Sequence, residues 1–170
     1  MKAMVLQGLR RVEKNSPPLV PMNVKDPVPG DNEILVRVSA CGVCHTELDE
    51  IEGRTPPPRF PVIPGHQVVG TVQEKGKGAG RFRVGERVGI AWIFSACGTC
   101  RFCLRGDENL CEQFRATGRD ADGGYAECIR VREEFALPIP EAFTDAEAAP
   151  LLCAGAIGYR SVRLTGMQEG

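Results

Sequence analysis

Four cysteines gathered in one short segment constrain this chain more than any other feature of its sequence. The cluster has gaps of two, two and seven residues and consists of Cys97, Cys100, Cys103 and Cys111. These gaps let the chain turn back and present four sulfur atoms to one point, which is the ligand set of a closed, tetrahedral zinc site. The opening Met1 to Val5 shows no export signal, so we expect reduced thiols and zinc rather than a disulfide cluster.

A zinc ion held by four thiolates has no open position for water or substrate. We therefore interpret this site as a structural zinc that holds together a lobe at about residues 94–115. Any chemistry has to be carried out by other residues of the chain.

Composition narrows the class of protein further. The 170 residues include 21 Lys plus Arg and 22 Asp plus Glu, which gives a net charge of -1. This balance argues against nucleic acid or an anionic membrane as a partner, and no apolar run approaches the roughly 18 residues of a membrane span. We expect a cytoplasmic protein. The 20 Gly and 13 Pro indicate many short strands joined by tight turns.

Residue patterns predict strands along most of the chain and helices near its end. We expect strands over residues 1–8, 33–41, 68–72 and 83–93, and a turn followed by a strand over 123–131. A short helix over 43–51 should stop at Gly53. Gly76 to Gly80 is glycine-rich like a phosphate cradle, but it lacks the Walker lysine, and we expect a turn. From about residue 145 the alanine-rich sequence predicts a helical tail.

Several short motifs, taken in order, are similar to those of one enzyme family. They are Gly42-Val43-Cys44-His45-Thr46-Glu47, Pro64-Gly65-His66, Gly85-Glu86-Arg87-Val88-Gly89, the cysteine cluster, Gly123-Gly124-Tyr125-Ala126-Glu127 and Leu152-Cys153-Ala154-Gly155. Together they resemble the zinc-dependent alcohol dehydrogenases of the medium-chain dehydrogenase/reductase family. The resemblance extends over essentially the whole chain.

The resemblance implies a second, catalytic zinc held by Cys44, His66 and Cys153, with a fourth position open to water or an alcohol oxygen. Two thiolates and a neutral imidazole leave such a site formally uncharged, so that the metal can still act as a Lewis acid. Each chain would then bind two zinc ions.

Four further residues have roles that the resemblance implies, and three of them also have a plainer interpretation. Thr46 would hydrogen-bond the substrate oxygen and begin a proton path, or would simply bond the backbone at a helix end. His45 would contact the cofactor pyrophosphate, or is an exposed polar residue. Trp92 would line the substrate pocket, or belongs to the core. Glu47 would hold the ligating histidine.

This sequence departs from the family pattern in three places close to the expected site. Glu47 stands where an aspartate is usual, Gln67 replaces a common glutamate, and Asp49 occupies the position of a histidine in the proton relay of many relatives. Cys41 and Cys128 match no ligand position. Cys41 and Cys44 could form a redox pair, but we favour the zinc motif for Cys44.

These features predict a mainly β fold, namely a partly open GroES-like barrel with a zinc lobe, short helices and a helical tail. Residues 1–150 would be the catalytic domain, and 151–170 a helix leading to a Rossmann domain that is missing here, because no G-x-G-x-x-G motif follows a strand. The resemblance implies an enzyme that interconverts small alcohols with aldehydes or ketones using NAD or NADP. The chain alone should be inactive and could form homo-oligomers. The alternatives are a stand-alone zinc-binding module and a thiol switch.

Overall fold

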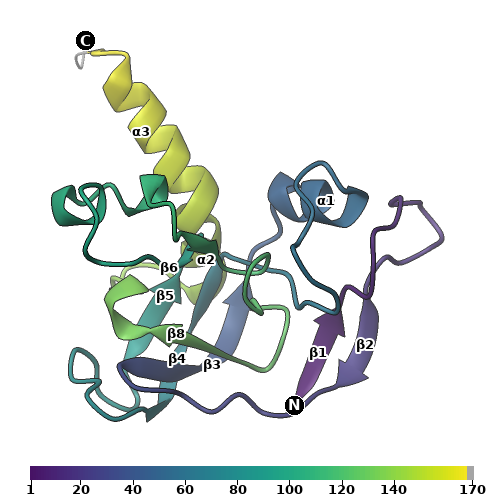
Figure 1. Ribbon diagram of the computed structural model, residues 1–170, viewed down its shortest axis with the longest axis horizontal. Helices are drawn as coiled ribbons and strands as arrows, with labels where there is room; N and C mark the ends of the chain where they lie inside the picture. Colours follow the sequence, from purple (N-terminus) through teal and green to yellow (C-terminus); the bar gives the residue numbers. More distant parts are fainter. Residues whose placement is uncertain (168–170) are drawn as a thin grey trace.

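The computed structural model describes residues 1–167, and its centre is one curled antiparallel sheet (Figure 1). The five strands lie in the order β8-β3-β4-β5-β9. Their bounds are Cys128–Arg132 for β8, Glu33–Cys41 for β3, Val68–Lys75 for β4, Arg87–Ile90 for β5 and Ala136–Pro138 for β9. The sheet forms an open half-barrel, as expected.

Two irregularities in β3 help to curl this sheet. The register of β3 against β4 shifts between Leu35 and Val36 and again between Val38 and Ala40. Shifts of this kind bend a strand and increase its twist. Inside the curve lies a core of mainly β-branched side chains: Ile34, Val36, Val68, Val72, Val88, Ile90, Ile129 and Val131.

Two smaller strand pairs complete the β structure. β1 (Lys2–Val5) pairs with β2 (Val20–Asn23), and β6 (Ile93–Ser95) pairs with β7 (Arg115–Ala116) at the two ends of the zinc lobe. The expected strand over 83–93 was wrong in its extent. It is divided into β5 and β6 because the chain leaves the sheet at Ala91 and Trp92.

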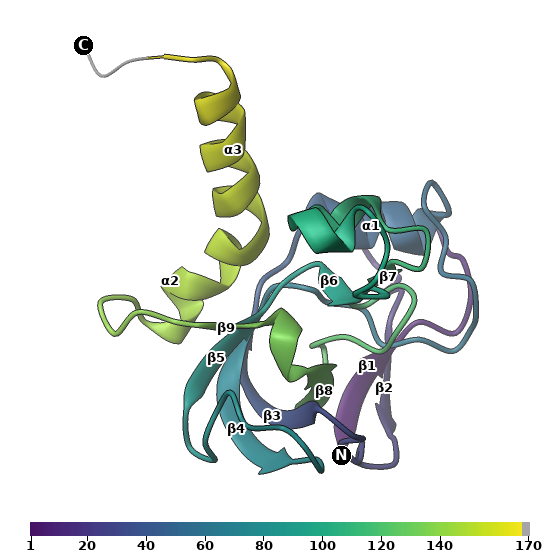
Figure 2. The same ribbon diagram turned by 60° about the vertical axis from the view of Figure 1, so that its left-hand side comes forward.

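The helices lie outside the sheet (Figures 1 and 2). α1 (His45–Glu52) ends on Gly53 in the left-handed conformation, as the sequence predicts. Short 3₁₀ turns span Cys103–Arg105 (η1), Glu108–Leu110 (η2) and Glu133–Phe135 (η3). The Gly76 to Gly80 segment is a turn after β4.

The tail begins with α2 (Asp145–Pro150). Thr144 and Glu147 form a reciprocal capping box at the start of this helix. The tail continues through a π-helical turn, η4 (Leu151–Gly155), into α3 (Ala156–Leu164). α2 packs on the sheet through Ala148 and Ala149, whereas α3 extends away from the body in both views and buries none of its residues. The predicted helix over 151–170 is confirmed as far as Leu164, and residues 168–170 lie outside the described residues.

No helix within residues 1–167 is both long enough and apolar enough to cross a membrane.

Candidate metal centres

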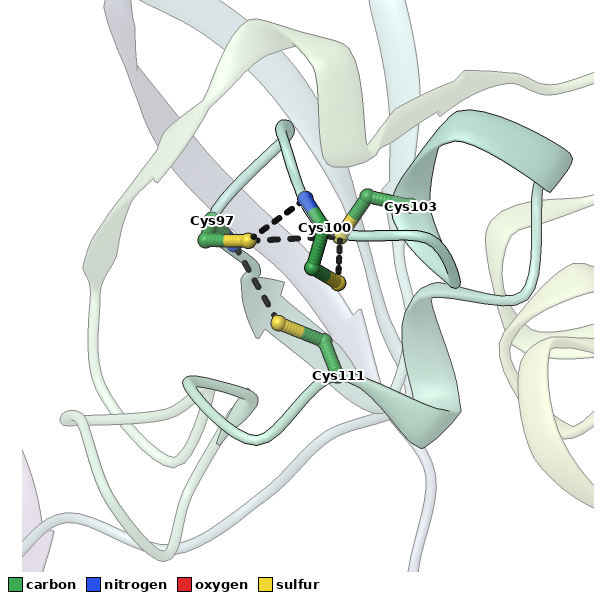
Figure 3. Close-up of side chains that lie close together, drawn as sticks. All are labelled: Cys97, Cys100, Cys103 and Cys111. Carbon is green, nitrogen blue, oxygen red and sulfur yellow. Dashed lines mark hydrogen bonds between the residues drawn. The ribbon is translucent and has the colours of Figure 1, made fainter.

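The four clustered cysteines meet in the lobe between β6 and β7 (Figure 3). Their sulfur atoms all lie within 4.8 Å of one another. Sγ of Cys103 lies 3.8 Å from Sγ of Cys97 and 3.6 Å from Sγ of Cys100. A tetrahedron with Zn–S bonds of about 2.3 Å has S···S edges of roughly 3.8 Å. The observed spacing therefore fits a zinc ion, and it is far too long for a disulfide bond of about 2.05 Å.

Backbone N–H groups point at these sulfur atoms and favour their thiolate form. The N–H of Cys100 donates to Sγ of Cys97 at 3.3 Å, and the N–H of Gln113 donates to Sγ of Cys111 at 3.3 Å. Hydrogen bonds from the backbone at Thr99 and then Cys100 lower the pKa of Cys97 to about 6. Burial, in contrast, raises the pKa of Cys103 to about 12, so a cation between the sulfur atoms is needed to hold all four as thiolates.

A second group forms from three elements that are distant in sequence. Cys44 precedes the first turn of α1, His66 ends the extended segment before β4, and Cys153 lies in η4. One ligand atom from each lies within 4.8 Å of the others, and the two sulfur atoms are 3.8 Å apart. The structure therefore brings together the three residues that the sequence motifs single out.

The surroundings of His66 leave its Nε2 nitrogen as the atom that could bind a metal ion. Its Nδ1 lies 2.6 Å from Oε1 of Glu47, whereas its buried Nε2 has no hydrogen-bond partner among the described residues. A buried ring nitrogen without a partner is unfavourable unless a ligand occupies it. The second carboxylate oxygen of Glu47 accepts a bond from the N–H of Cys44 at 2.8 Å, so a single side chain orients two of the three candidate ligands.

Gly65 lets the backbone that precedes His66 pass close to the Tyr125 ring. Its φ is +100°, and a Cβ atom there would lie 2.7 Å from the ring of Tyr125. Only glycine combines that backbone conformation with that lack of bulk. The Pro64-Gly65-His66 sequence thus places His66 1% exposed at the bottom of the site.

The Cys153 sulfur would not carry a negative charge here without a cation beside it. Burial, and then the charge of Cys44, raise the pKa of Cys153 to about 11. A divalent cation would hold both sulfur atoms in the charged form, and soft thiolates with an imidazole are a ligand set typical of zinc. The residues present therefore fit a zinc ion at this second centre too.

The other predicted residues surround this centre at different depths. Oγ1 of Thr46 lies 3.5 Å from Sγ of Cys44. The Trp92 ring packs edge-on against His66 with ring centroids 5.1 Å apart. The His45 side chain is 75% exposed, with Nδ1 3.4 Å from the Asp49 carboxylate.

The two remaining cysteines lie apart from both centres. Burial raises the pKa of Cys41 to about 12, and Sγ of Cys128 lies 3.5 Å from Oε1 of Gln73. Within residues 1–167, neither belongs to a group of side chains able to hold a metal. The partner of Cys44 is Cys153 rather than Cys41.

Residues near the second centre also include some that the sequence reasoning missed. The Arg119 guanidinium lies 5.6 Å above the Trp92 ring, and Phe114 packs 6.3 Å from that ring on the lobe side. Glu50 is buried on α1. The one sequence signal for Glu50 was its spacing of three residues from Glu47, which puts both on one helix face.

Comparison with known proteins gives the family. The family model of the alcohol dehydrogenase GroES-like domain matches residues 30–141. The chain belongs to this family. It is 51% identical over 158 residues to "Probable alcohol dehydrogenase AdhA" of Mycobacterium tuberculosis, covering 90% of this chain and 46% of that protein.

Two further comparisons extend this result for the GroES-like domain. The whole chain is 44% identical over 171 residues to an alcohol dehydrogenase of Geobacillus stearothermophilus, and the match covers 100% of this chain and 49% of the relative. A solved NAD-dependent alcohol dehydrogenase superposes with a TM-score of 0.91 at 28% identity, covering 100% of this chain and 49% of that one. The chain spans about half the length of the relatives that it matches.

Proposed function

We propose that this chain is the zinc-binding catalytic half of an alcohol dehydrogenase that interconverts small alcohols with aldehydes or ketones, using NAD or NADP. The observation that carries the proposal is the convergence of Cys44, His66 and Cys153, with Nε2 of His66 lacking a hydrogen-bond partner among residues 1–167. These three residues would hold a catalytic zinc, and the four lobe cysteines a structural one. A zinc ion with three protein ligands keeps a position for substrate and lowers the pKa of the alcohol that it binds.

The protein side chains would orient the substrate and handle its proton. Thr46 lies beside Cys44, where its hydroxyl can accept the proton of an alcohol held at the open position. Glu47 fixes the tautomer of His66 because its carboxylate accepts the Nδ1 proton, which leaves Nε2 as the ligand. Trp92 forms an apolar wall against His66 and would exclude water from the reacting carbon.

The nucleotide would be bound by the half of the relatives' length that this chain does not span. We assign residues 1–150 to the catalytic domain, and 151–170 to a helix that leads to a Rossmann domain. His45 is exposed at the start of α1, next to the site, and would contact the cofactor pyrophosphate. Reduced thiols in both centres are consistent with a cytoplasmic location.

Zinc analysis and activity together test this function. The purified chain should contain two zinc ions, and a chelator should remove the ion at Cys44, His66 and Cys153 first, because that site depends on three separate elements. The full-length protein should oxidise primary or secondary alcohols with NAD or NADP. Two zinc ions without any turnover by the full-length protein would favour a non-enzymatic zinc-binding module. Reversible disulfide formation without bound zinc would favour a thiol switch.

A further inference from the structure

Glu50 is a buried carboxyl group whose role the zinc ligands do not explain. It is 1% exposed, and neither of its oxygens accepts a hydrogen bond from any residue in the described part of the chain. Burying a carboxylate without a partner is costly, so such groups are rare unless they serve a function. Ionisable side chains in this condition are concentrated at functional sites.

Helix geometry places Glu50 next to the second metal centre. Residues three and four apart on a helix are neighbours, with Cβ atoms about 5 to 6 Å apart. Glu50 therefore follows both Glu47 and Thr46 by one turn on the inner face of α1. Glu47 contacts His66, and Thr46 lies beside Cys44. No direct hydrogen bond joins Glu50 to Thr46 among the described residues, so a path for a proton between these two side chains would run through one water molecule.

Asp49, the other carboxylate one turn from Thr46, is already occupied. Its Oδ1 accepts a hydrogen bond from Nε of Arg54 and lies 3.4 Å from Nδ1 of His45. The Arg54 hydrogen bond lowers the pKa of Asp49. A carboxylate held in this way is a weak proton acceptor, and it lies on the outer side of the helix, with its side chain 31% exposed.

The charges around Glu50 favour proton exchange near neutral pH. Burial, and then the charge of Glu47, raise the pKa of Glu50 to about 8. Asp49 on the same helix and Asp120 across from it also raise this pKa, while Arg119 lowers it. The Tyr125 phenol also senses the charge of Glu50, and its own pKa is raised mainly by burial. A base with a pKa close to the working pH is the most effective.

We propose that Glu50 accepts the proton of the alcohol by way of the Thr46 hydroxyl, in place of Asp49. The inference rests on the proposed dehydrogenase function. As the substrate O–H bond breaks, its proton moves to Oγ1 of Thr46, and the hydroxyl proton of Thr46 moves through one water molecule to the Glu50 carboxylate. The substrate C–H bond then breaks, and its hydrogen leaves with the electron pair to the oxidised nicotinamide ring. The carbonyl product forms, and Glu50 holds one proton.

The test compares Glu50→Gln with Asp49→Asn and the control Glu52→Gln in the full-length, zinc-loaded protein. In wild type, kcat/KM for alcohol oxidation should rise with pH around 8. Glu50→Gln should lose this rise and fall on the order of 100-fold at pH 9, while Asp49→Asn and Glu52→Gln should keep the wild-type profile. Glu50→Asp should restore part of the rise. Loss of the rise in Asp49→Asn, or its persistence in Glu50→Gln, would overturn the proposal.

A second readout does not depend on activity. Infrared difference spectra of protein carrying ¹³C-labelled glutamate should show a protonated carboxylic acid that is absent from Glu50→Gln and titrates near pH 8. If Glu50→Gln fails to fold, Thr46→Val should remove the same pH-dependent rise, because the proposed path passes through Thr46. Absence of a carboxyl titrating in this range would overturn the role of Glu50 while leaving dehydrogenase activity intact. An inactive wild-type protein with both zinc ions would overturn the proposed function, and the role of Glu50 with it.

Discussion

Oε1 of Glu47 lies 2.6 Å from Nδ1 of His66, and both side chains are almost fully buried. The same carboxylate also accepts the backbone N–H of Cys44 through its other oxygen, at 2.8 Å. A glutamate can accept both bonds at once, whereas a glutamine has only one oxygen to offer. The longer side chain at a position where an aspartate is usual therefore still connects two candidate zinc ligands.

Glu47→Gln should weaken zinc binding at Cys44, His66 and Cys153 by about 10- to 100-fold, because the histidine loses the acceptor that orients it. Zinc in the cysteine lobe should be unaffected. Competition with a chromophoric chelator measures both sites. Glu52→Gln is the matched control, since Glu52 lies on the same helix but bonds Arg54 near the surface. Equal zinc affinity in the two variants would contradict this role for Glu47.

The two metal centres should contribute differently to folding. The lobe that carries Cys100 has only two short 3₁₀ turns between β6 and β7, so its conformation depends on the metal. Cys153 lies in a turn of a helix that already packs on the sheet. Cys100→Ser should lower the melting temperature markedly, and Cys153→Ser should only empty its site.

Scanning calorimetry with zinc analysis checks this pair of variants. Cys128→Ser serves as the control, because Cys128 belongs to neither metal group. An equal loss of thermal stability in Cys100→Ser and Cys153→Ser would show that the division into a structural and a functional centre is wrong.

The candidate zinc ligands could be predicted from the sequence because each is part of a short local motif. Spacing alone indicated the lobe site, and resemblance to a family located Cys44, His66 and Cys153. The mainly β fold followed from the many strand patterns and turns, and the family match confirms it. The roles assigned to Thr46, His45 and Trp92 remain predictions.

Features that depend on packing between distant elements were not predictable. The sequence pattern did not single out Glu50, because only the fold shows that this face of α1 is buried. The break at Ala91 and Trp92 was missed because the residues around it continue a strand pattern. No local signal shows that the Trp92 ring packs against His66.

Arg87 is another residue whose role depends on packing between distant elements, because it binds the segment that leads into α2. Its Nε donates to Asp145 at 2.5 Å, and its terminal nitrogens donate to the carbonyls of Pro140 and Phe143 at 3.2 and 2.7 Å. The Asp145 carboxylate also accepts a bond from the Ser39 hydroxyl. This arginine thus connects β5 to the loop that leads into α2, and so supports the position of Cys153.

Arg87→Lys should destabilise the chain by about 1 to 3 kcal/mol, because a lysine cannot reproduce three forked hydrogen bonds. It should also speed loss of zinc from the site that contains Cys153, without affecting the lobe. Urea denaturation and a chelation time course measure the two effects. Arg83→Lys is the control at an exposed position nearby. If both variants lose zinc at the same rate as wild type, Arg87 does not position Cys153.

Glu50 should make the stability of the chain depend on pH. Its pKa is raised from 4.5 to about 8, mainly by burial. Because the folded state binds this proton more tightly than the unfolded chain does, the stability contribution is complete below 4.5 and is lost as pH rises through about 8. Glu50→Gln carries no charge at any pH, so its free energy of unfolding should fall less than that of wild type between pH 6 and 9.

Urea titrations at fixed zinc concentration across this pH range provide the measurement. Glu52→Gln is again the control, since the Arg54 hydrogen bond lowers the pKa of Glu52 and keeps it ionised throughout the range. Parallel pH dependence in wild type and Glu50→Gln would show that the buried carboxyl does not titrate in this window.

The final prediction concerns α3, none of whose residues is buried. Ile157, Tyr159, Val162 and Leu164 are 50 to 75% exposed. Apolar surface of this kind marks a contact with another protein surface, and the proposed occupant is the nucleotide-binding half that the relatives' greater length implies.

The 170-residue chain alone should therefore self-associate and should not oxidise alcohols with NAD or NADP. Holding the nicotinamide within about 3 to 3.5 Å of the substrate carbon supplies roughly 7 to 11 kcal/mol of barrier reduction, and exposed His45 cannot provide that positioning by itself. Light scattering should show oligomers that Val162→Ser with Leu164→Ser reduces, while Arg160→Ser, a polar change on the same helix, should not. Turnover by the short chain would mean that it contains a complete cofactor site.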